Sequence, residues 1–134
     1  MTTTATLITS PRERLDFLPR HFGHLATAVE RAIFDTLTET SPNYEGGFWH
    51  FYNLSNGGLY LAPDSSDPLR IVIPPNYYSG NVSPDAAGII TCLSVFNQLC
   101  WEYPTREDFN NIFYALRDFA FDHEEAVEII RATD

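Results

Sequence analysis

The feature that most constrains this fold is the tetrapeptide at residues 55–58, Ser-Asn-Gly-Gly, between two apolar segments. Asn-Gly is the favoured pair for the two positive-φ positions of a type I′ turn, which joins antiparallel strands. Residues 48–54 before the turn are rich in aromatic side chains, and Leu-Tyr-Leu-Ala follows it at 59–62. The sequence therefore predicts a β-hairpin over about residues 48–63.

The turn also sets an expected strand register and an expected core face. With Asn56 and Gly57 at its centre, Leu54 pairs with Leu59 and Tyr52 with Leu61. Because side chains alternate between the faces of a sheet, one face, expected to supply core, collects Phe48, His50, Tyr52, Leu54, Leu59 and Leu61. The other face carries Trp49, Phe51, Asn53 and Tyr60.

The three aromatic residues of that second face have two interpretations. Exposed aromatic side chains favour interfaces, so Trp49, Phe51 and Tyr60 are candidates for contact with a partner. Alternatively, one of the helices covers this face and buries all three. The sequence leaves both open.

Helix signals flank the hairpin on both sides. Ser10-Pro11 with Glu13 predicts a short helix that ends before Pro19, and periodic apolar residues predict a second helix over about 23–39. Ser83-Pro84 opens a long helix to about Trp101, whose wide apolar face marks it as central. Two more helices are expected, one after Pro104-Thr105 and one capped by Asp122 with Glu125.

Strands at 69–73 and about 77–82 complete the pattern. The predicted class is α+β, with an antiparallel three- to four-stranded β-meander packed against about five helices in the order α-α-β-β-β-(β)-α-α-α. A chain of 134 residues with 44% hydrophobic content supplies one core, so we expect a single domain over 1–134. Residues 1–9 are expected to be a flexible N-terminus.

The charge is strongly acidic. Eighteen Asp and Glu face eight basic residues, all of them arginine, for a formal net charge of −10. Direct binding to DNA or RNA is therefore not expected, because such affinity comes largely from Lys and Arg that neutralise phosphates. The acidic surface fits a basic partner, or simply keeps the protein soluble.

We expect a soluble cytoplasmic protein, because neither a signal peptide nor an apolar run of about 20 residues is present. Cys92 and Cys100 lie eight positions apart in one predicted helix, roughly 12 Å along its axis, which is too far for a disulfide. Buried, reduced thiols are the preferred interpretation.

The sequence offers no recognisable catalytic or metal site. His21 and His24 are three residues apart without a third ligand at a usual spacing, and His50 sits within a strand. His123 follows a helix cap and is expected to be solvated. Neither cysteine has a nearby histidine, and neither glycine pair matches a phosphate loop. We therefore expect no cofactor, no metal and no catalytic residues.

Four segments in order resemble one known family. The segment at 44–63 is similar to the signature hairpin of the plasmid antirestriction proteins ArdB and KlcA. Residues 14–23, 83–89 and 114–123 extend the similarity to nearly the whole chain. The resemblance implies a protein that shields incoming plasmid or mobile-element DNA from host type I restriction, without a cofactor.

Three mechanisms remain open for such a role. In the first, the protein engages the host type I restriction-modification complex, or an associated factor, through protein-protein contact. In the second, the acidic C-terminal helices imitate DNA and occupy a DNA-binding channel, through the carboxylates of Asp118, Asp122, Glu124, Glu125 and Glu128. In the third, it is an uncharacterised enzyme. The first is the preferred interpretation.

Overall fold

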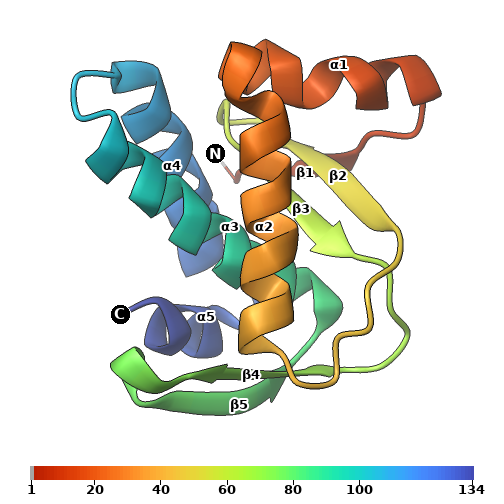
Figure 1. Cartoon of the computed structure of the whole chain (residues 1–134), viewed down its shortest axis with the longest axis vertical. Helices are drawn as coiled ribbons and strands as arrows, with labels where there is room; N and C mark the ends of the chain where they lie inside the picture. The colour runs from red at the N-terminus through yellow and green to blue at the C-terminus, as the bar shows by residue number, and fades with distance from the viewer. Residues whose placement is uncertain (1) are drawn as a thin grey trace.

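The computed structural model describes residues 2–134 as helices packed around two antiparallel sheets (Figure 1). The strands are β1 Ala5–Leu7, β2 Trp49–Leu54, β3 Leu59–Pro63, β4 Leu69–Ile73 and β5 Tyr78–Val82. The α-helices are α1 Pro11–Phe22, α2 Ala26–Thr40, α3 Pro84–Glu102, α4 Glu107–Phe121 and α5 Ala126–Thr133. The predicted α+β class and its five helices are confirmed.

The strands do not form the single meander that the sequence suggested. One sheet has the order β1-β2-β3, and β4 pairs only with β5. Helix α3 takes the place beside β3 that a fourth strand would need: the Cys92 thiol lies 3.4 Å from the Leu61 amide nitrogen and 3.7 Å from its carbonyl oxygen. A Cβ atom built on Gly88 would come within 2.2 Å of that oxygen, so the close approach requires glycine.

The N-terminal segment forms a strand, where a flexible terminus was expected. Residues 5–7 pair antiparallel with β2, Leu7 opposite Tyr52, and the Ile8 amide donates to the Phe51 carbonyl at 2.9 Å. Threonine is β-branched and favours extended backbone, which makes the threonine-rich start a suitable edge strand. Met1 lies outside the described residues.

Both serine caps are present. Ser10 Oγ accepts from the Glu13 amide at 3.4 Å, and Ser83 Oγ accepts from the Ala86 amide at 3.1 Å. Helix α1 continues through Pro19 to Phe22, beyond its predicted end, although a proline inside a helix removes one hydrogen bond. The extension buries Phe22 beside Phe96 and Phe109, and this packing offsets the loss.

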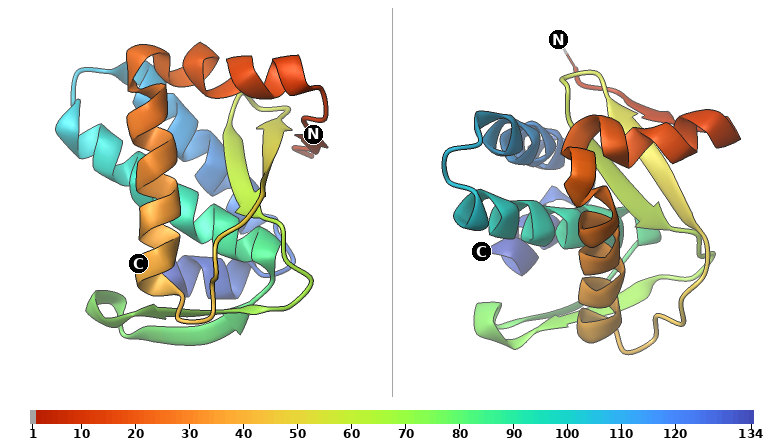
Figure 2. Two further views of the ribbon diagram at one scale, coloured as in Figure 1. Left: turned by 45° about the vertical axis from the view of Figure 1, so that its right-hand side comes forward. Right: turned by 45° about the horizontal axis from the view of Figure 1, so that its top comes forward.

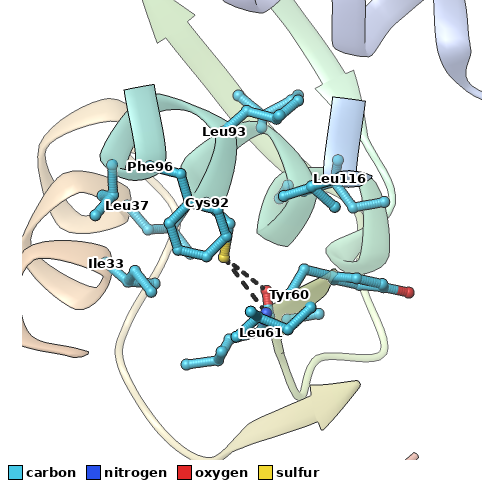
Figure 3. Close-up of a cluster of buried hydrophobic side chains, with 14 of the residues drawn as sticks. Ile33, Leu37, Tyr60, Leu61, Cys92, Leu93, Phe96 and Leu116 are labelled. Carbon is cyan, nitrogen blue, oxygen red and sulfur yellow. Dashed lines mark hydrogen bonds between the residues drawn. The ribbon is translucent and has the colours of Figure 1, made fainter. Parts of the chain in front are cut away.

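Helix α3 is the central element, as predicted, with α2, α4 and α5 packed around it (Figure 2). Figure 3 shows Ile33 and Leu37 of α2 and Leu116 of α4 converging on Cys92 and Phe96 of α3. Burial raises the pKa of the Cys92 thiol to about 12, so this cysteine stays protonated, in agreement with the expected structural role.

Candidate functional site

The hairpin register differs by one residue from the prediction. Tyr52 pairs with Tyr60 and Phe51 with Leu61. Of the turn residues only Gly57 has a positive φ, of 91°, whereas a type I′ turn needs two. The Asn56 side chain explains the difference: its amide nitrogen donates to the Ala115 carbonyl at 2.8 Å, and its oxygen accepts from the Gly58 amide at 3.0 Å.

The aromatic residues predicted as contact candidates are buried. Trp49, Phe51 and Tyr60 are 3%, 6% and 2% exposed. Trp49 packs on Phe34 of α2, and Phe51 stacks on Phe17 of α1 with ring centroids 5.8 Å apart. For Trp49 and Phe51, the alternative that helices cover this face is therefore correct, and the predicted aromatic patch is not exposed.

Tyr60 is buried on the opposite face from the other two, because the shifted register moves it beside Tyr52. The two rings stack with centroids 4.8 Å apart, and Phe119 of α4 stacks on the far side of Tyr60 at 5.7 Å. The Tyr60 hydroxyl donates to Asp85 at 2.7 Å. Burial and this carboxylate raise the tyrosine pKa, so Tyr60 remains a neutral donor.

The face expected to be core is partly open. We define the open face as Leu7, Phe48, His50 and Tyr52, which share one side of β1 and β2. Phe48 is 54% exposed and Leu7 41%, while His50 and Tyr52 are half-buried. The prediction of Phe48 as a core residue is wrong, because α4 covers this side of the sheet only near Gly58 and Tyr60.

Neighbouring rings make the open face continuous. The ring centroids of Phe48 and His50 lie 5.4 Å apart, and those of His50 and Tyr52 lie 6.4 Å apart. The Arg14 guanidinium carbon sits 4.5 Å from the centre of the Phe48 ring, and its nitrogen donates to the Trp49 carbonyl at 2.9 Å. This end of the surface therefore already holds one guanidinium on an aromatic ring.

Carboxylates border the open face. Asp64 lies 3.2 Å from His50 Nε2, and its side chain is well exposed. Partial burial raises the pKa of Tyr52, and the negative charges of Asp85 and then Asp64 raise it further. Both carboxylates thus act on Tyr52, while the Arg14 guanidinium adds a positive charge at the Phe48 end of the open face.

A second cluster lies where α3 meets the turn between α4 and α5. Asp85 accepts from Tyr60, and its other oxygen lies 2.8 Å from His123 Nε2. His123 Nδ1 accepts from the Glu125 amide at 2.9 Å, so Nε2 carries the proton toward Asp85. The expectation that His123 is solvated is wrong: its side chain is largely buried, and the bond to Asp85 raises its pKa.

Two of the five candidate mimic carboxylates have internal partners. Glu125 accepts from both the amide and the hydroxyl of Ser83, and its side chain caps nothing in α5. Glu128 accepts from the Tyr78 hydroxyl at 2.8 Å; burial and this bond raise the pKa of Tyr78 to about 12. The exposed members of the set are Asp118, Asp122 and Glu124.

Within residues 2–134, no group of three or more His, Cys, Asp or Glu side chains is arranged to hold a metal ion. His21 packs edge-on against Phe17, and burial, with a smaller effect of Arg20, lowers its pKa. Over the same residues, none of the helices combines the length and apolarity that crossing a membrane requires.

Comparison with known proteins decides the family. A family model described as antirestriction protein matches residues 42–134, a segment that includes the hairpin, the open-face residues Phe48, His50 and Tyr52, and the cluster of Asp85, Tyr60 and His123. The chain belongs to the antirestriction protein family. Antirestriction proteins of this family are not enzymes, in agreement with the prediction.

Relatives extend the match beyond that segment. The chain is 41% identical to an antirestriction protein KlcA of Escherichia coli over 91% of its own length and 88% of that protein. A second Escherichia coli KlcA is 39% identical over 98% of this chain and 94% of the relative. A solved structure superposes with a TM-score of 0.90 at 37% identity, covering 100% of this chain and 96% of that one.

That solved structure comes from a study described as showing a novel fold for the KlcA and ArdB proteins. The same description attributes to them antirestriction activity against Type I DNA restriction systems in vivo but not in vitro. The predicted ArdB/KlcA resemblance and the fold are thus confirmed. The sequence did not predict the correct register of the hairpin, which decides which side chains of β3 share a face with those of β2.

Proposed function

We propose that this antirestriction protein protects incoming plasmid or mobile-element DNA from host type I restriction-modification systems. It acts without catalysis, by contact with the restriction complex or an associated factor. The near full-length similarity to KlcA and ArdB proteins, described as active against type I systems, supports the target. Activity described for them in vivo but not in vitro favours a factor present in the cell.

The observation that carries the mechanism is the open face. Exposed aromatic rings beside a polar rim are typical of protein interfaces, where aromatic side chains are enriched and supply much of the binding energy. Here Phe48 is exposed next to half-buried His50 and Tyr52, with Asp64 at the border. The rings of Phe48, His50 and Tyr52 contact one another along this face.

DNA mimicry has less support from the geometry. A mimic needs free carboxylates in a phosphate-like array, whereas the carboxylates of Glu125 and Glu128 accept hydrogen bonds from Ser83 and Tyr78. Mimicry also predicts inhibition that competes with DNA and weakens steeply with salt. Inhibition of a purified type I enzyme with that salt dependence would favour mimicry over the contact mechanism.

The test is phage plating on restricting cells that carry the wild-type gene, the Phe48→Ala variant or the matched Trp101→Ala variant. Trp101 is an exposed aromatic residue at the far end of α3, so it controls for the loss of a surface ring. Wild type and Trp101→Ala should raise plating efficiency over the empty vector, and Phe48→Ala should lose most of this protection at equal protein level. Wild-type plating equal to the empty vector would refute the antirestriction role.

A further inference from the structure

The outer edge of β1 has unpaired backbone groups. The Ile8 amide donates to the Phe51 carbonyl and the Ser55 amide donates to the Thr4 carbonyl, both at 2.9 Å. Hydrogen bonding alternates along an antiparallel strand, so the even-numbered residues of this segment face β2. Ala5 and Leu7 therefore direct their amide and carbonyl groups away from the sheet.

Within residues 2–134, this edge is exposed to solvent. All three residues of β1 are exposed, and the strand packs chiefly on β2. Figure 2 shows β1, in dark red, at the outer margin of the sheet beside β2. Exposed strand edges of this kind accept an extended peptide as an additional strand, in which main-chain bonds give affinity and alternate side chains give specificity.

The edge and the open face share a residue. Leu7 contributes its backbone to the edge and its side chain to the open face, where it lies opposite Tyr52. A strand added to β1 would place every second side chain on the same side of the sheet as Leu7. Neighbouring strands lie about 4.8 Å apart, so long side chains from that strand pass over Leu7 and extend toward Tyr52 of β2.

The charge of this surface selects the occupant. Asp64 and Asp85 set a negative potential at Tyr52, and the protein carries a net charge of −10. The Arg14 guanidinium carbon lies 4.5 Å from the Phe48 centroid and 4.2 Å from the centroid of Phe51, on the other face of β2, so a guanidinium packs on aromatic rings at this edge of the strand. A second copy of the chain would bring another ten negative charges, which opposes pairing of two β1 edges.

We propose that the β1 edge and the open face bind an extended, arginine- or lysine-bearing segment of the partner protein as a fourth strand of the sheet. This inference rests on the proposed function, since it names the chemistry of the partner at the same surface. The backbone of Ala5 and Leu7 holds the segment, and its basic side chains extend over Leu7 toward Tyr52.

Binding is tested with a short fluorescein-labelled peptide of alternating arginine and valine, measured by fluorescence anisotropy against the full chain. The comparison peptides replace arginine by glutamate, or carry N-methyl groups on alternate amides to remove main-chain donors. The arginine peptide should bind, and the glutamate peptide should not. N-methylation of the amides that face β1 should weaken binding by about tenfold, the effect of one or two lost hydrogen bonds.

Two pairs of protein variants separate strand addition from general attraction to an acidic protein. Leu7→Ala and Leu7→Pro both lose the leucine side chain, but only proline also removes the outward amide, so the proline variant should bind about tenfold more weakly than the alanine variant. Asp64→Asn removes one of the two negative charges that act at Tyr52 and should weaken binding, while Asp67→Asn, in the same exposed loop, should change it less. Equal affinities within either pair of variants, or an affinity that N-methylation of the peptide leaves unchanged, would overturn the inference.

The plating assay separates failure of this inference from failure of the proposed function. If Leu7→Pro loses peptide binding but protects restricting cells like wild type, the strand interface is wrong and the antirestriction role stands. If the wild type itself fails to protect, the role is wrong. A dimer that forms through β1 in sedimentation measurements and disappears in Leu7→Pro would overturn the basic segment as occupant and favour a second copy.

Discussion

Strands β3 and β1 are the two edges of one sheet, and their environments are opposite. Every residue of β3 is buried and every residue of β1 is exposed. Helix α3 seals the β3 edge, with Gly88 against Leu61 and the Cys92 thiol between the Leu61 amide and carbonyl. The β1 edge has no such cover.

This difference separates stability from recognition within one small sheet. The β3 side buries apolar surface, which dominates folding free energy, and it closes the edge that would otherwise attract other strands. The β1 side contributes little buried area and keeps its outward amides available. Substitutions on the β3 side should therefore unfold the protein, and those on the β1 side should change binding.

Leu61→Ala should have the largest effect. Leu61 is fully buried between α2, α3 and the hairpin, and its truncation leaves a cavity that should lower the free energy of unfolding by about 2–5 kcal/mol. The matched change on the open edge, Leu7→Ala, should cost about 0.5 kcal/mol. Urea denaturation measures both, and similar losses would remove the distinction between the two edges.

Gly88→Ala tests the sealed edge directly. The new methyl group would lie 2.2 Å from the Leu61 carbonyl oxygen and 2.6 Å from the Ala62 Cα, both backbone atoms that cannot rotate away. Overpacking should cost about 1–3 kcal/mol, although alanine is the better helix former. An unchanged or higher denaturation midpoint would show that α3 does not need this close approach.

His123→Gln should have a smaller, pH-dependent effect on the junction that ties α3 to β3 through Asp85. The bond to Asp85 raises the folded-state pKa of His123 above its unfolded value. The stabilisation from this bond is therefore fully present below about pH 6.5, the unfolded-state pKa of histidine. It is lost as the pH rises through the raised folded-state pKa of His123. The difference in free energy of unfolding between wild type and variant, on the order of 1 kcal/mol at about pH 5–6, should shrink as the pH rises through the raised pKa of His123.

His21→Gln is the matched control for this pH dependence. Burial, and secondarily Arg20, lowers the folded-state pKa of His21, so protonation opposes folding there. Removing His21 should therefore raise stability relative to wild type as pH falls below about 6.5. Thermal unfolding over a pH series measures both variants, and gaps with the same sign of pH dependence would contradict the assignment.

Leu7→Pro should have the smallest effect on stability. The outward amide of Leu7 bonds to nothing in β2, so proline at this edge position should cost about 0.5 kcal/mol or less. Thr6→Pro removes an amide on the side facing β2 and should cost about 1 kcal/mol. Equal losses in urea denaturation would show that the two neighbouring amides are not oriented in opposite directions.

Much of the fold was predictable because its signals are local. The caps at Ser10 and Ser83 depend on side chains that bond within one turn, and the central position of α3 follows from its apolar circumference. Family membership was predictable from the residues of the hairpin and of three later segments. None of these depends on how distant elements pack.

The errors concern contacts between distant segments. Asn56 bonds to Ala115 of α4, and that bond accompanies a turn that shifts the register by one residue. A shift of one residue exchanges the faces of β3 relative to β2, which placed Tyr60 beside Tyr52. Phe48 is exposed because α4 covers this side of the sheet only near Gly58 and Tyr60. His123 and Asp85 lie 38 positions apart in the sequence, and only the packing of distant elements brings them into contact.

The sequence by itself determined the elements, their order and the family, because hydrophobic periodicity, caps and turn residues act over a few neighbouring positions. Only the tertiary structure decided which face of β2 is buried, which edge of the sheet is sealed and which carboxylates are free. These features depend on how α3 and α4 pack against the hairpin. Side chains such as Phe48 and Phe51 are chemically alike, and only their packing separates the surface from the core.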